Sequence, residues 1–341
     1  MSDIDLRSLK MSDYIISEFD ESLFNSYQIF VQRNFGKNAY QGKIEYLNWL
    51  YFKNPYGRGY SDFLVVLDLK NNVIGCLHKI RYEIRNNGKN VNLACASIHN
   101  LMIDLNHRNG VGFLLLRELL KKEKSFLIPG VIGKLSDSYR SLGLTPFKSF
   151  WGFKLFKPHL INFTKILFGH KLNKDKGDFL AKKCLCNGVK LEIAFTNELL
   201  KIINKNSNDF IITKEYLQWR LFDDINKPTL VLWSNNKKSV FLITLGRRRR
   251  FPVARIFFST IDNLDDGRIL LKNTFRLLGS LGYPLTLITS TDSNFLELAK
   301  SQKIRHKSPA PDSYFYSKLI TLNNVDSWPL VSDLGFEERF T

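Results

Sequence analysis

Hydrophobic and polar positions along the first half of the chain follow periods that predict a mixed α/β order. Apolar residues at helical spacing predict helices over residues 21–34, 45–52 and 113–124. Runs rich in β-branched and aromatic residues predict strands over residues 14–18, 63–69, 73–84, 91–104 and 126–132. Asn71-Asn72 and Asn86-Asn87-Gly88 are typical of hairpin turns, so we expect an antiparallel meander in the middle of this half. A short helix over residues 137–144 and aromatic-rich strands over residues 147–156 complete it.

One part of this pattern occurs twice. Residues 45–52 (EYLNWLYF) return 170 positions later (215 − 45) as residues 215–222 (EYLQWRLF). A loop with a proline, an apolar run, an Asn-containing turn and a second apolar run follow each copy. An offset of half the chain indicates a duplicated domain and not a solenoid of short units. We therefore expect two tandem α/β domains with α+β mixed sheets, residues 1–158 and 159–341.

Composition agrees with two packed domains. The chain has 341 residues, 44% of them hydrophobic and 13% aromatic, which argues against disorder. The first ten residues carry four charged side chains with no apolar segment behind them, and the apolar runs are too short to span a bilayer. We expect a soluble, cytoplasmic protein without a membrane partner. Cys76, Cys95, Cys184 and Cys186 lack a metal-site pattern, so we expect no metal, with Cys184-x-Cys186 as a metal half-site the less favoured alternative.

The net charge of +18 points to anionic partners. It divides into +7 over residues 1–156 (21 − 14) and +11 over the remainder (29 − 18), so no basic arm stands out. A spread positive field attracts nucleic acid, but it equally attracts small polyanions such as a nucleotide-sugar or coenzyme A. The one dense cluster, residues 247–250, lies between two apolar runs and is typical of a hairpin tip. We expect a solvated tip there, with phosphate contact as the alternative.

A glycine-bearing turn follows the strand predicted over residues 91–104. Residues 106–112 (NHRNGVG) lead directly into the helix predicted from Phe113. Backbone N–H groups at such a helix start can bind a pyrophosphate, and glycine lets the phosphate approach the backbone. Arg108 can add a charge-assisted hydrogen bond. Taken alone, the same pattern also fits a plain strand-to-helix turn.

This turn and a later segment resemble the GNAT acyltransferases, which use acyl-coenzyme A. The family's loop pattern is Arg or Gln, two residues, Gly, any residue, then Gly or Ala, and residues 107–112 match it except that His107 replaces the first residue. A later tyrosine, followed four residues on by Gly and an apolar residue, is matched by Tyr139, Gly143 and Leu144. The resemblance covers residues 14–156. It implies that coenzyme A is held by the strand end, the loop and the helix start, namely Leu101, Met102, Ile103, His107, Arg108, Asn109, Gly110, Val111, Gly112 and Phe113.

A narrower resemblance is carried by the helix around Trp49, by Asn54-Pro55-Tyr56-Gly57 and by the partial repeat. These look like duplicated GNAT proteins of bacterial surface-polysaccharide pathways, which acylate nucleotide-linked amino sugars. Such sugar N-acyltransferases act on dTDP-linked 3-amino-3,6-dideoxyhexoses with acetyl or hydroxybutyryl donors. The resemblance implies an acyl-CoA donor and a nucleotide-linked amino sugar acceptor, with nucleic acid disfavoured as a partner.

The second half keeps the elements without the loop. Its sequence predicts a strand at residues 254–259, a helix at 269–281 and a strand at 284–290. Between the first two, residues 261–268 carry three carboxylates and one glycine, and the carboxylates would repel a pyrophosphate. We expect the second domain to serve the architecture or the acceptor.

The mechanism implied by the resemblance is direct attack of a neutral amine on the thioester. Backbone N–H groups of residues 101–104 meet the oxyanion, and Tyr139 occupies the family's position for a general acid. His99 is a candidate base, Asp104 a weaker one, and an amine of near-neutral pKa needs none. Side chains that could stack on a base or sugar ring are Trp49, Tyr40 and Trp151. For all five residues other than Asp104 a core or structural role remains the alternative.

Two other classes of function remain open. An aminoacyl-tRNA-dependent transferase of the FemABX kind also has two GNAT-like domains and a basic surface, but it needs no pyrophosphate cradle. A nucleic-acid-binding protein with a relic fold would use the +18 charge and residues 247–250.

Overall fold

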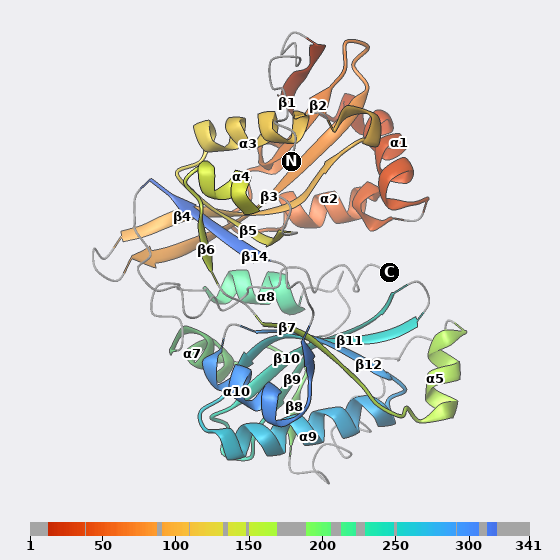
Figure 1. Cartoon of the computed structure of the whole chain (residues 1–341), viewed down its shortest axis with the longest axis vertical. Coiled ribbons are helices and arrows are strands. Elements are labelled where there is room, and N and C mark those ends of the chain that lie inside the picture. The colour runs from red at the N-terminus through yellow and green to blue at the C-terminus, as the bar shows by residue number, and fades with distance from the viewer. Residues whose placement is uncertain are drawn as a thin grey trace. The chain divides into compact units, whose positions relative to one another are not determined.

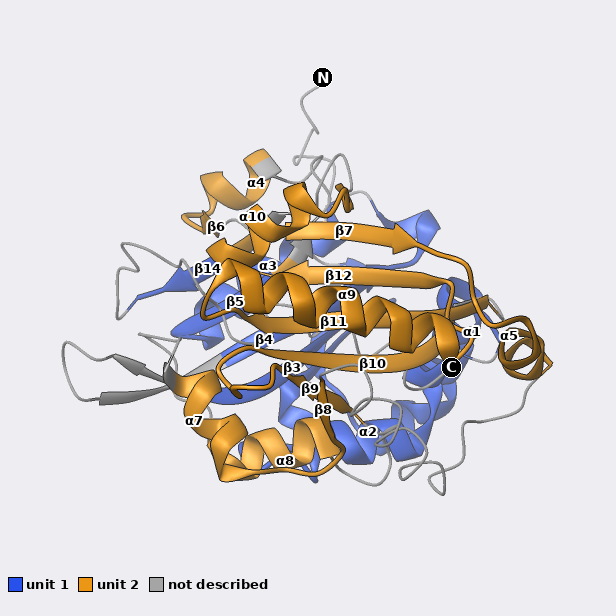
Figure 2. Ribbon diagram, turned by 90° about the horizontal axis from the view of Figure 1, so that it is seen from below, with its two compact units in different colours: residues 1–86, 90–128, 315–321 blue, residues 87–89, 129–314, 322–341 orange. Residues whose placement is uncertain are grey.

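The computed structural model (Figure 1) describes residues 13–318 except 38, 87–90, 109, 132–135, 148–149, 169–188, 206–212, 223–228, 249–250, 291 and 307–311. The chain divides into two compact units, coloured separately in Figure 2. One unit comprises residues 1–86, 90–128 and 315–321, and the other comprises residues 87–89, 129–314 and 322–341. Each unit builds most of one mixed sheet with helices packed on it, which confirms the predicted α/β class.

The first sheet has seven strands in the order β1-β2-β3-β4-β5-β14-β6. Their bounds are β1 (Ile15–Glu18), β2 (Phe63–Leu67), β3 (Val73–Asn86), β4 (Val91–Ile103), β5 (Ser125–Val131), β6 (Thr145–Phe147) and β14 (Asp312–Ser317). The pairs from β1 to β4 are antiparallel, as the hairpin turns predict, and β4 pairs with β5 in parallel. The helices and 3₁₀ turns between these strands are η3 (Glu21–Leu23), α1 (Phe24–Phe35), η4 (Tyr40–Gly42), α2 (Ile44–Tyr51), η5 (Gly59–Asp62), η6 (Leu105–His107), α3 (Val111–Lys122) and α4 (Ser136–Ser141).

The second sheet has seven strands in the order β13-β7-β12-β11-β10-β9-β8. Their bounds are β7 (Phe150–Leu155), β8 (Lys190–Glu192), β9 (Leu230–Trp233), β10 (Val240–Arg248), β11 (Phe251–Thr260), β12 (Leu285–Ser290) and β13 (Arg305–His306). The helices of this part are α5 (Leu160–Leu167), α7 (Asn197–Lys205), α8 (Lys214–Phe222), α9 (Leu264–Ser280) and α10 (Ser293–Ser301). Helix α9 buries Leu270, Leu271, Leu277 and Leu278 in the same core as residues of β10, β11 and β12, and so covers one face of the sheet.

The two sheets have the same topology, as the repeat predicts. Each begins with a strand and two helices, continues through three antiparallel strands and a helix, and adds a parallel strand. The two copies of the repeated octapeptide form α2 and α8, and the positions that they share bury Tyr46, Leu47 and Trp49 in one copy and Tyr216, Leu217 and Trp219 in the other. The repeat therefore records a shared way of packing a helix into a core.

The sixth place in each sheet is filled by a strand from elsewhere in the chain. In the first sheet β14 lies between β5 and β6, and in the second sheet β7 lies between β12 and β13. β7 pairs with β12 from Leu155 opposite Leu285 to Phe150 opposite Ser290. A division at residue 158 would thus place β7 with the first sheet and β14 with the second, whereas each belongs to the other sheet. Hydrophobic periodicity does not show which sheet an apolar strand joins.

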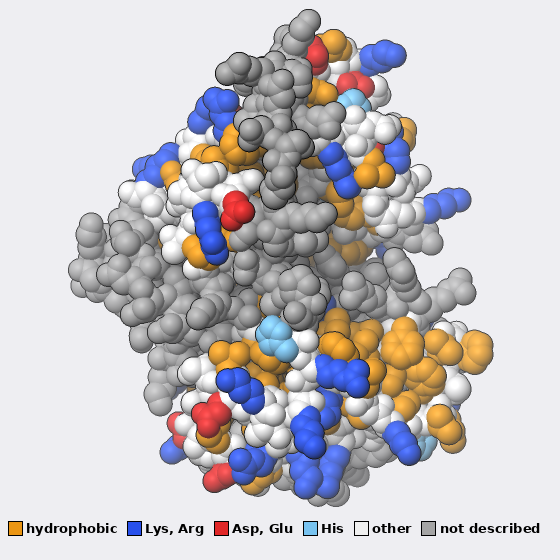
Figure 3. Space-filling view, in the orientation of Figure 1, with side chains coloured by type: hydrophobic (Ala, Val, Ile, Leu, Met, Phe, Trp, Pro, Cys, Tyr) orange, Lys and Arg blue, Asp and Glu red, His pale blue; other side chains and the backbone are white. Residues whose placement is uncertain are grey.

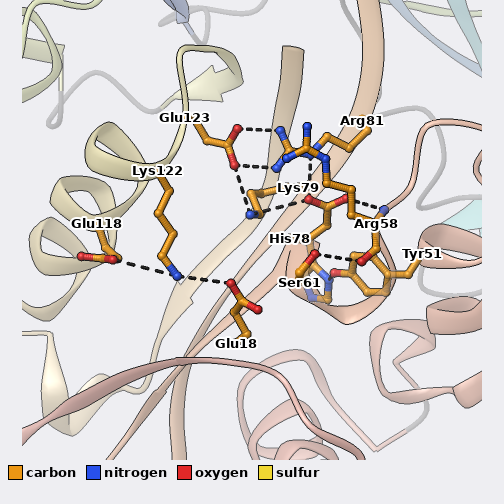
Figure 4. Close-up of polar contacts among 11 residues, drawn as sticks. Glu18, Tyr51, Arg58, Ser61, His78, Lys79, Arg81, Glu118, Lys122 and Glu123 are labelled. Carbon is orange, nitrogen blue, oxygen red and sulfur yellow. Dashed lines mark hydrogen bonds and ion pairs between the residues drawn. The ribbon is translucent and has the colours of Figure 1, made fainter. Parts of the chain in front are cut away.

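A buried charge network in the first unit joins β3, η5 and the residue that caps α3 (Figure 4). Arg81 donates to Glu123 (Nη2–Oε1, 2.6 Å) and to Asp62 (Nε–Oδ1, 2.7 Å), and Lys79 donates to Glu123 (Nζ–Oε1, 3.1 Å). All four side chains are at most 8% exposed. Burial by itself raises the pKa of Glu123, but hydrogen bonds and charge from Arg81, then Lys79, hold that pKa below its usual value. The network therefore fixes the C-terminal end of α3 against the sheet in its charged form.

Element boundaries at two helix starts differ from the predicted ones. α3 begins at Val111, two residues before the predicted start, and α9 begins at Leu264, five residues early. The Asn263 side chain accepts a hydrogen bond from the Asp266 N–H (2.9 Å), which caps α9 ahead of its first predicted apolar position. None of the described helices combines the length and apolarity that crossing a membrane requires.

Candidate functional site

The end of β4 is distorted by a β-bulge at the predicted donor site. Cys76 of β3 opposes Met102 and His78 opposes His99, so Leu77 alone faces both Asn100 and Leu101. Asn100 has φ of +49°, a left-handed conformation that is uncommon outside glycine. A bulge leaves an extra residue outside the ladder and bends the strand. Backbone groups at the predicted oxyanion site are thereby turned out of regular pairing.

β4 and β5 separate just before this bulge. Among the described residues, their parallel register comprises Ala96 opposite Phe126 and Ser97 opposite Leu127. β4 then continues to Ile103 alongside β3, where Ile103 opposes Gly75. The β5-facing edge of residues 98–103 therefore presents backbone N–H and C=O groups to the space between the two strands. Such an edge can pair with an extended ligand that carries amide groups.

The predicted loop joins this strand to the start of α3. Gly110 adopts the left-handed conformation (φ +91°, ψ −9°) as the residue before the helix, and its carbonyl accepts from the Phe113 N–H (2.9 Å). The N–H groups of Val111 and Gly112 begin the helix, where no earlier turn supplies an acceptor. A Cβ on Gly112 would lie 3.6 Å from Ile103 Cγ1, an ordinary contact. A helix start with free backbone N–H groups can bind an anion.

His107 and Arg108 flank this loop in different ways. His107 Nδ1 lies 3.4 Å from the Tyr14 hydroxyl, and the two rings meet edge to face. Arg108 is exposed and folds back on β4, where its Nε donates to the Ile103 carbonyl (3.1 Å). Arg108 thus lies over the strand end, while His107 faces a hollow of about 420 Å³ together with Arg33, Asp104 and others. Asn109, also predicted to bind the donor, lies outside the described residues.

Asp104 is occupied by an ion pair. Its buried carboxylate contacts the Arg33 guanidinium, whose side chain is 52% exposed. Its backbone N–H donates to Ile74 (2.8 Å). The Asp104 carboxylate is thus engaged by Arg33 and is not directed at the strand edge of β4 by any described contact.

His99, the predicted base, is half-buried on β4 directly across from the buried His78. Its Nε2 lies 2.8 Å from the Ser97 hydroxyl. His78 lies between two tyrosines: the Tyr27 hydroxyl donates to the Gln41 carbonyl (3.1 Å), so its oxygen accepts from His78 Nε2 (3.0 Å), and the Tyr51 hydroxyl donates to Nδ1. Burial lowers the pKa of His78 to about 3, and the nearby His99 adds to this effect. His78 is therefore neutral at physiological pH and adds no positive charge to the β3–β4 pair at this position.

Tyr139, the predicted general acid, lies on the short helix α4. It is 3% exposed and stacks on Tyr314 of β14 with ring centroids 5.3 Å apart. Burial, and then the neighbouring Tyr314, raise the pKa of Tyr139 to about 12. Its hydroxyl therefore keeps its proton at neutral pH, as a general acid requires. The Leu144 N–H donates to the Tyr139 carbonyl (3.1 Å) in the turn at Gly143, whose φ is +81°.

The three aromatic residues predicted to contact the acceptor lie in cores. Trp49 is 0% exposed, Tyr40 6% and Trp151 8%. Tyr40 packs edge to face on Tyr46, and Trp151 lies on β7 opposite Thr289 of the second sheet. The structure thus lends no support to a binding role for these rings. Their helical or alternating spacing fits core packing equally well.

The corresponding turn of the second sheet is built without an anion site. Asn263 caps α9 with its own side chain, and Asp265 and Asp266 occupy the first helical turn. The glycine of this turn, Gly267, serves packing, because a Cβ there would lie 2.7 Å from Ile261 Cγ2. Carboxylates and a self-capped helix start both disfavour phosphate.

Other predicted features can be placed in part. Cys76 is a buried free thiol, whereas Cys184 and Cys186 lie outside the described residues. The described residues contain no group of three or more His, Cys, Asp or Glu side chains arranged for a metal ion. Residues 249–250 of the basic cluster also lie outside the described residues. β10 and β11 pair antiparallel, as the predicted hairpin requires.

Sequence reasoning missed the bulge, the strand separation and the Tyr–His–Tyr arrangement. The bulge carries little sequence signal, since asparagine at Asn100 is only weakly indicative of a left-handed residue. His78 lies within an apolar run, and its partners come from α1 and α2, 51 and 27 residues away. Only the fold brings these residues together.

No family model and no curated protein matches this chain. Solved structures match it in fold. A candidate acetyltransferase from Pyrococcus horikoshii is 14% identical, with a TM-score of 0.57 and 95% of this chain and 94% of that chain covered. A GCN5-related N-acetyltransferase from Anabaena variabilis is 13% identical (TM-score 0.54; 89% and 72% covered). A Saccharomyces cerevisiae N-myristoyltransferase with bound myristoyl-CoA is 12% identical (TM-score 0.55; 97% and 84% covered). The chain therefore has the fold of GNAT-type acyltransferases over nearly its whole length, with two GNAT-like parts.

Proposed function

We propose that this protein is an acyl-CoA-dependent N-acyltransferase. The observation that carries the proposal is the continuous unit formed by the bulged end of β4, its separation from β5, and the left-handed Gly110 that opens α3. An extended thioester with amide groups fits a strand edge, and a pyrophosphate fits the adjacent helix start. The solved N-myristoyltransferase of the same fold has myristoyl-CoA bound.

In this proposal the donor is held by backbone more than by side chains. The N–H groups of Val111 and Gly112 bind the pyrophosphate, and Arg108 approaches it from the end of β4, where it already contacts Ile103. Leu101, Met102 and Ile103 offer their backbone edge to the pantetheine arm, and Phe113 follows on the first helical turn. His107 lies beside the loop, where its ring meets Tyr14 edge to face.

The chemistry is direct transfer. The amine attacks the thioester carbonyl carbon and forms a C–N bond, while a backbone N–H near the bulge at Asn100 stabilises the oxyanion. The C–S bond then breaks, and the thiolate takes a proton from Tyr139. His99 takes the proton released by the attacking nitrogen, either directly or through water. Tyr139 recovers its proton from solvent before the next turnover.

We propose a nucleotide-linked amino sugar as the acceptor, with a dTDP-3-amino-3,6-dideoxyhexose as the first candidate and acetyl or 3-hydroxybutyryl as the acyl group. The support is the resemblance of the duplicated chain to sugar N-acyltransferases and the net charge of +18, which attracts a nucleotide diphosphate. The product would serve surface polysaccharide (O-antigen or capsule) biosynthesis in the cytoplasm. The second domain, without a phosphate loop, would support the fold or hold the acceptor.

The test combines donor binding with product analysis. The full chain is heated with coenzyme A, acetyl-CoA and 3-hydroxybutyryl-CoA, and a Gly110→Glu variant serves as the control whose carboxylate repels the pyrophosphate. We expect a rise in melting temperature for the wild type only. Mass spectrometry after incubation with a panel of nucleotide-linked amino sugars should then show a mass gain equal to the acyl group.

Three outcomes would overturn parts of this proposal. The absence of stabilisation by every coenzyme A species would remove the donor. Transfer from aminoacyl-tRNA that survives in the Gly110→Glu variant would assign the chain to the FemABX kind. Binding of nucleic acid with steep salt dependence and no acyl transfer would make it a nucleic-acid-binding protein.

A further inference from the structure

Helix α5 exposes an apolar face in the second unit. Leu160, Ile161 and Phe168 are 72%, 61% and 80% exposed. Together with the exposed Thr164 and Lys165 they recur every three to four residues and form one side of the helix. Figure 3 shows hydrophobic side chains gathered over α5, with Lys and Arg side chains beside them. Three large apolar side chains that share one exposed helix face mark a binding surface more than a scatter of single residues does.

The opposite side of α5 is apolar as well and is firmly packed. Ile166 is 5% exposed, and Phe163 meets Phe251 of β11 edge to face at 5.8 Å. The Asn162 side chain donates to the Ser280 carbonyl (2.7 Å) at the end of α9. Gly282 passes so close that a Cβ on it would lie 2.5 Å from the Asn162 carbonyl carbon. α5 is therefore fixed to the second unit by one side and exposes a second apolar side. A surface helix that contacts only water usually has a polar outer side.

Cations lie on α5 and near its start. Lys157, Lys165, Lys272 and Arg276 are exposed, and no described carboxylate pairs with any of them. A hollow of about 540 Å³ lies just before the start of α5. Lys157, Lys272 and Arg276 line it together with Phe156, His159 and Phe275. Residues 150–168 and 267–291 contain no Asp or Glu. Apolar side chains with Lys and Arg side chains near them, among the residues that the structure describes, complement an anionic surface.

We propose that the α5 face, defined as Leu160, Ile161, Phe168 and the cations Lys157, Lys165, Lys272 and Arg276, docks on the surface of an anionic lipid bilayer. Apolar side chains enter the boundary between headgroups and acyl chains, and Lys and Arg side chains attract anionic headgroups. A protein partner would need an acidic rim of matching outline, whereas a bilayer supplies negative charge over any outline. Docking on a bilayer surface differs from the expectation that the protein has no membrane partner, and it is independent of the proposed acyl transfer.

The experiment is sedimentation of the full chain with vesicles of pure phosphatidylcholine or of phosphatidylcholine with phosphatidylglycerol. We expect partition onto the anionic vesicles only. The double variant Ile161→Ser/Phe168→Ser should reduce the partition coefficient at least about tenfold, since each exposed apolar side chain loses its burial in lipid. The double variant Lys272→Gln/Arg276→Gln should reduce it by roughly 25-fold at low salt, about fivefold per cation, and less at high salt.

The matched control is Leu69→Ser/Leu105→Ser, which removes two apolar side chains of the first unit that are 70% and 69% exposed. Its partition should equal that of the wild type, and unchanged melting temperatures would show that all three variants fold. Absence of binding to anionic vesicles, equal binding to both vesicle types, or an equal loss in the control would overturn the proposal. A dimer in sedimentation equilibrium that Ile161→Ser/Phe168→Ser abolishes would assign the face to a second copy of the chain instead.

Discussion

Replacing Gly110 by alanine tests the candidate phosphate loop through its backbone. Gly110 has φ of +91° and ψ of −9°, a left-handed conformation. An L-residue there costs about 1–2 kcal/mol, which glycine avoids because it has no Cβ. The matched control is Gly112→Ala, two residues later and inside the first turn of α3. Gly112 has an ordinary φ, and its new Cβ would touch Ile103 Cγ1 at an unstrained 3.6 Å.

The magnitude follows from where the strain is relieved. Without donor, the Gly110→Ala loop can leave the left-handed conformation. Donor binding must then restore this conformation, and the binding free energy becomes less favourable by the same amount, about 1–2 kcal/mol. This corresponds to a donor Kd roughly 5- to 30-fold weaker. Gly112→Ala should keep the Kd within about threefold and stabilise α3 by up to roughly 1 kcal/mol, since alanine is the better helix former.

Isothermal titration of both variants with coenzyme A measures these values directly. Circular dichroism and the melting temperature would show whether each variant folds. The reasoning would be refuted by a Gly110→Ala variant that binds as tightly as the wild type. An equal loss of affinity in both variants would also contradict it, because the loop would then be sensitive to added volume and not to backbone conformation.

Three further predictions concern other residues. Tyr139→Phe should lower kcat by about 10²-fold or more with little change in donor Kd, and an unchanged kcat would remove Tyr139 from the mechanism. Because the pKa of Tyr139 is about 12, the wild-type rate should show no decrease from ionisation of this tyrosine below about pH 11. Glu123→Gln should lower the free energy of unfolding in urea by about 3–5 kcal/mol, because the two buried cations Arg81 and Lys79 then share Asp62 as their remaining counter-charge in the network. The exposed Lys121→Gln should cost less than about 1 kcal/mol, and equal effects of the two variants would contradict this. His78 has a folded pKa of about 3 against an unfolded value of 6.5, so the unfolded chain binds more protons between these pH values and stability falls as pH is lowered; His78→Phe should reduce this slope by up to about 1.4 kcal/mol per pH unit, and an unchanged slope would show that His78 is not the cause.

Much of the fold follows from local pattern, because strands and helices here bury regular faces. The meander, the strand β4 and the helix α3 were predictable from periodicity, and the repeat around Trp49 predicted the second, equivalent sheet. The loop at Gly110 was predictable because glycine is the residue that favours the left-handed backbone conformation found there, and a glycine after a predicted strand is visible in the sequence.

The rest depends on contacts between distant residues. Trp49 and Trp151 could not be distinguished from ligand-binding rings, since an aromatic side chain has the same periodicity in a core and in a site. The bulge at Asn100 arises from the register of β3 against β4, which is a property of the pair and not of either strand. The exposed apolar face of α5 was not predicted, because apolar residues of a helix are expected to be buried and the sequence does not show which of them face solvent.

β7 and β14 are each an interior strand of a sheet built mostly from the other half of the chain. β14 is an interior strand of the first sheet, between β5 and β6, so the sheet with the candidate donor site cannot close until residues 312–317 have been synthesised. A gene truncated after residue 158 would encode the phosphate loop but leave this sheet open, with β7 attached and its own partner β12 missing. Deleting the second half would therefore remove an interior strand of the first sheet together with most of the second sheet.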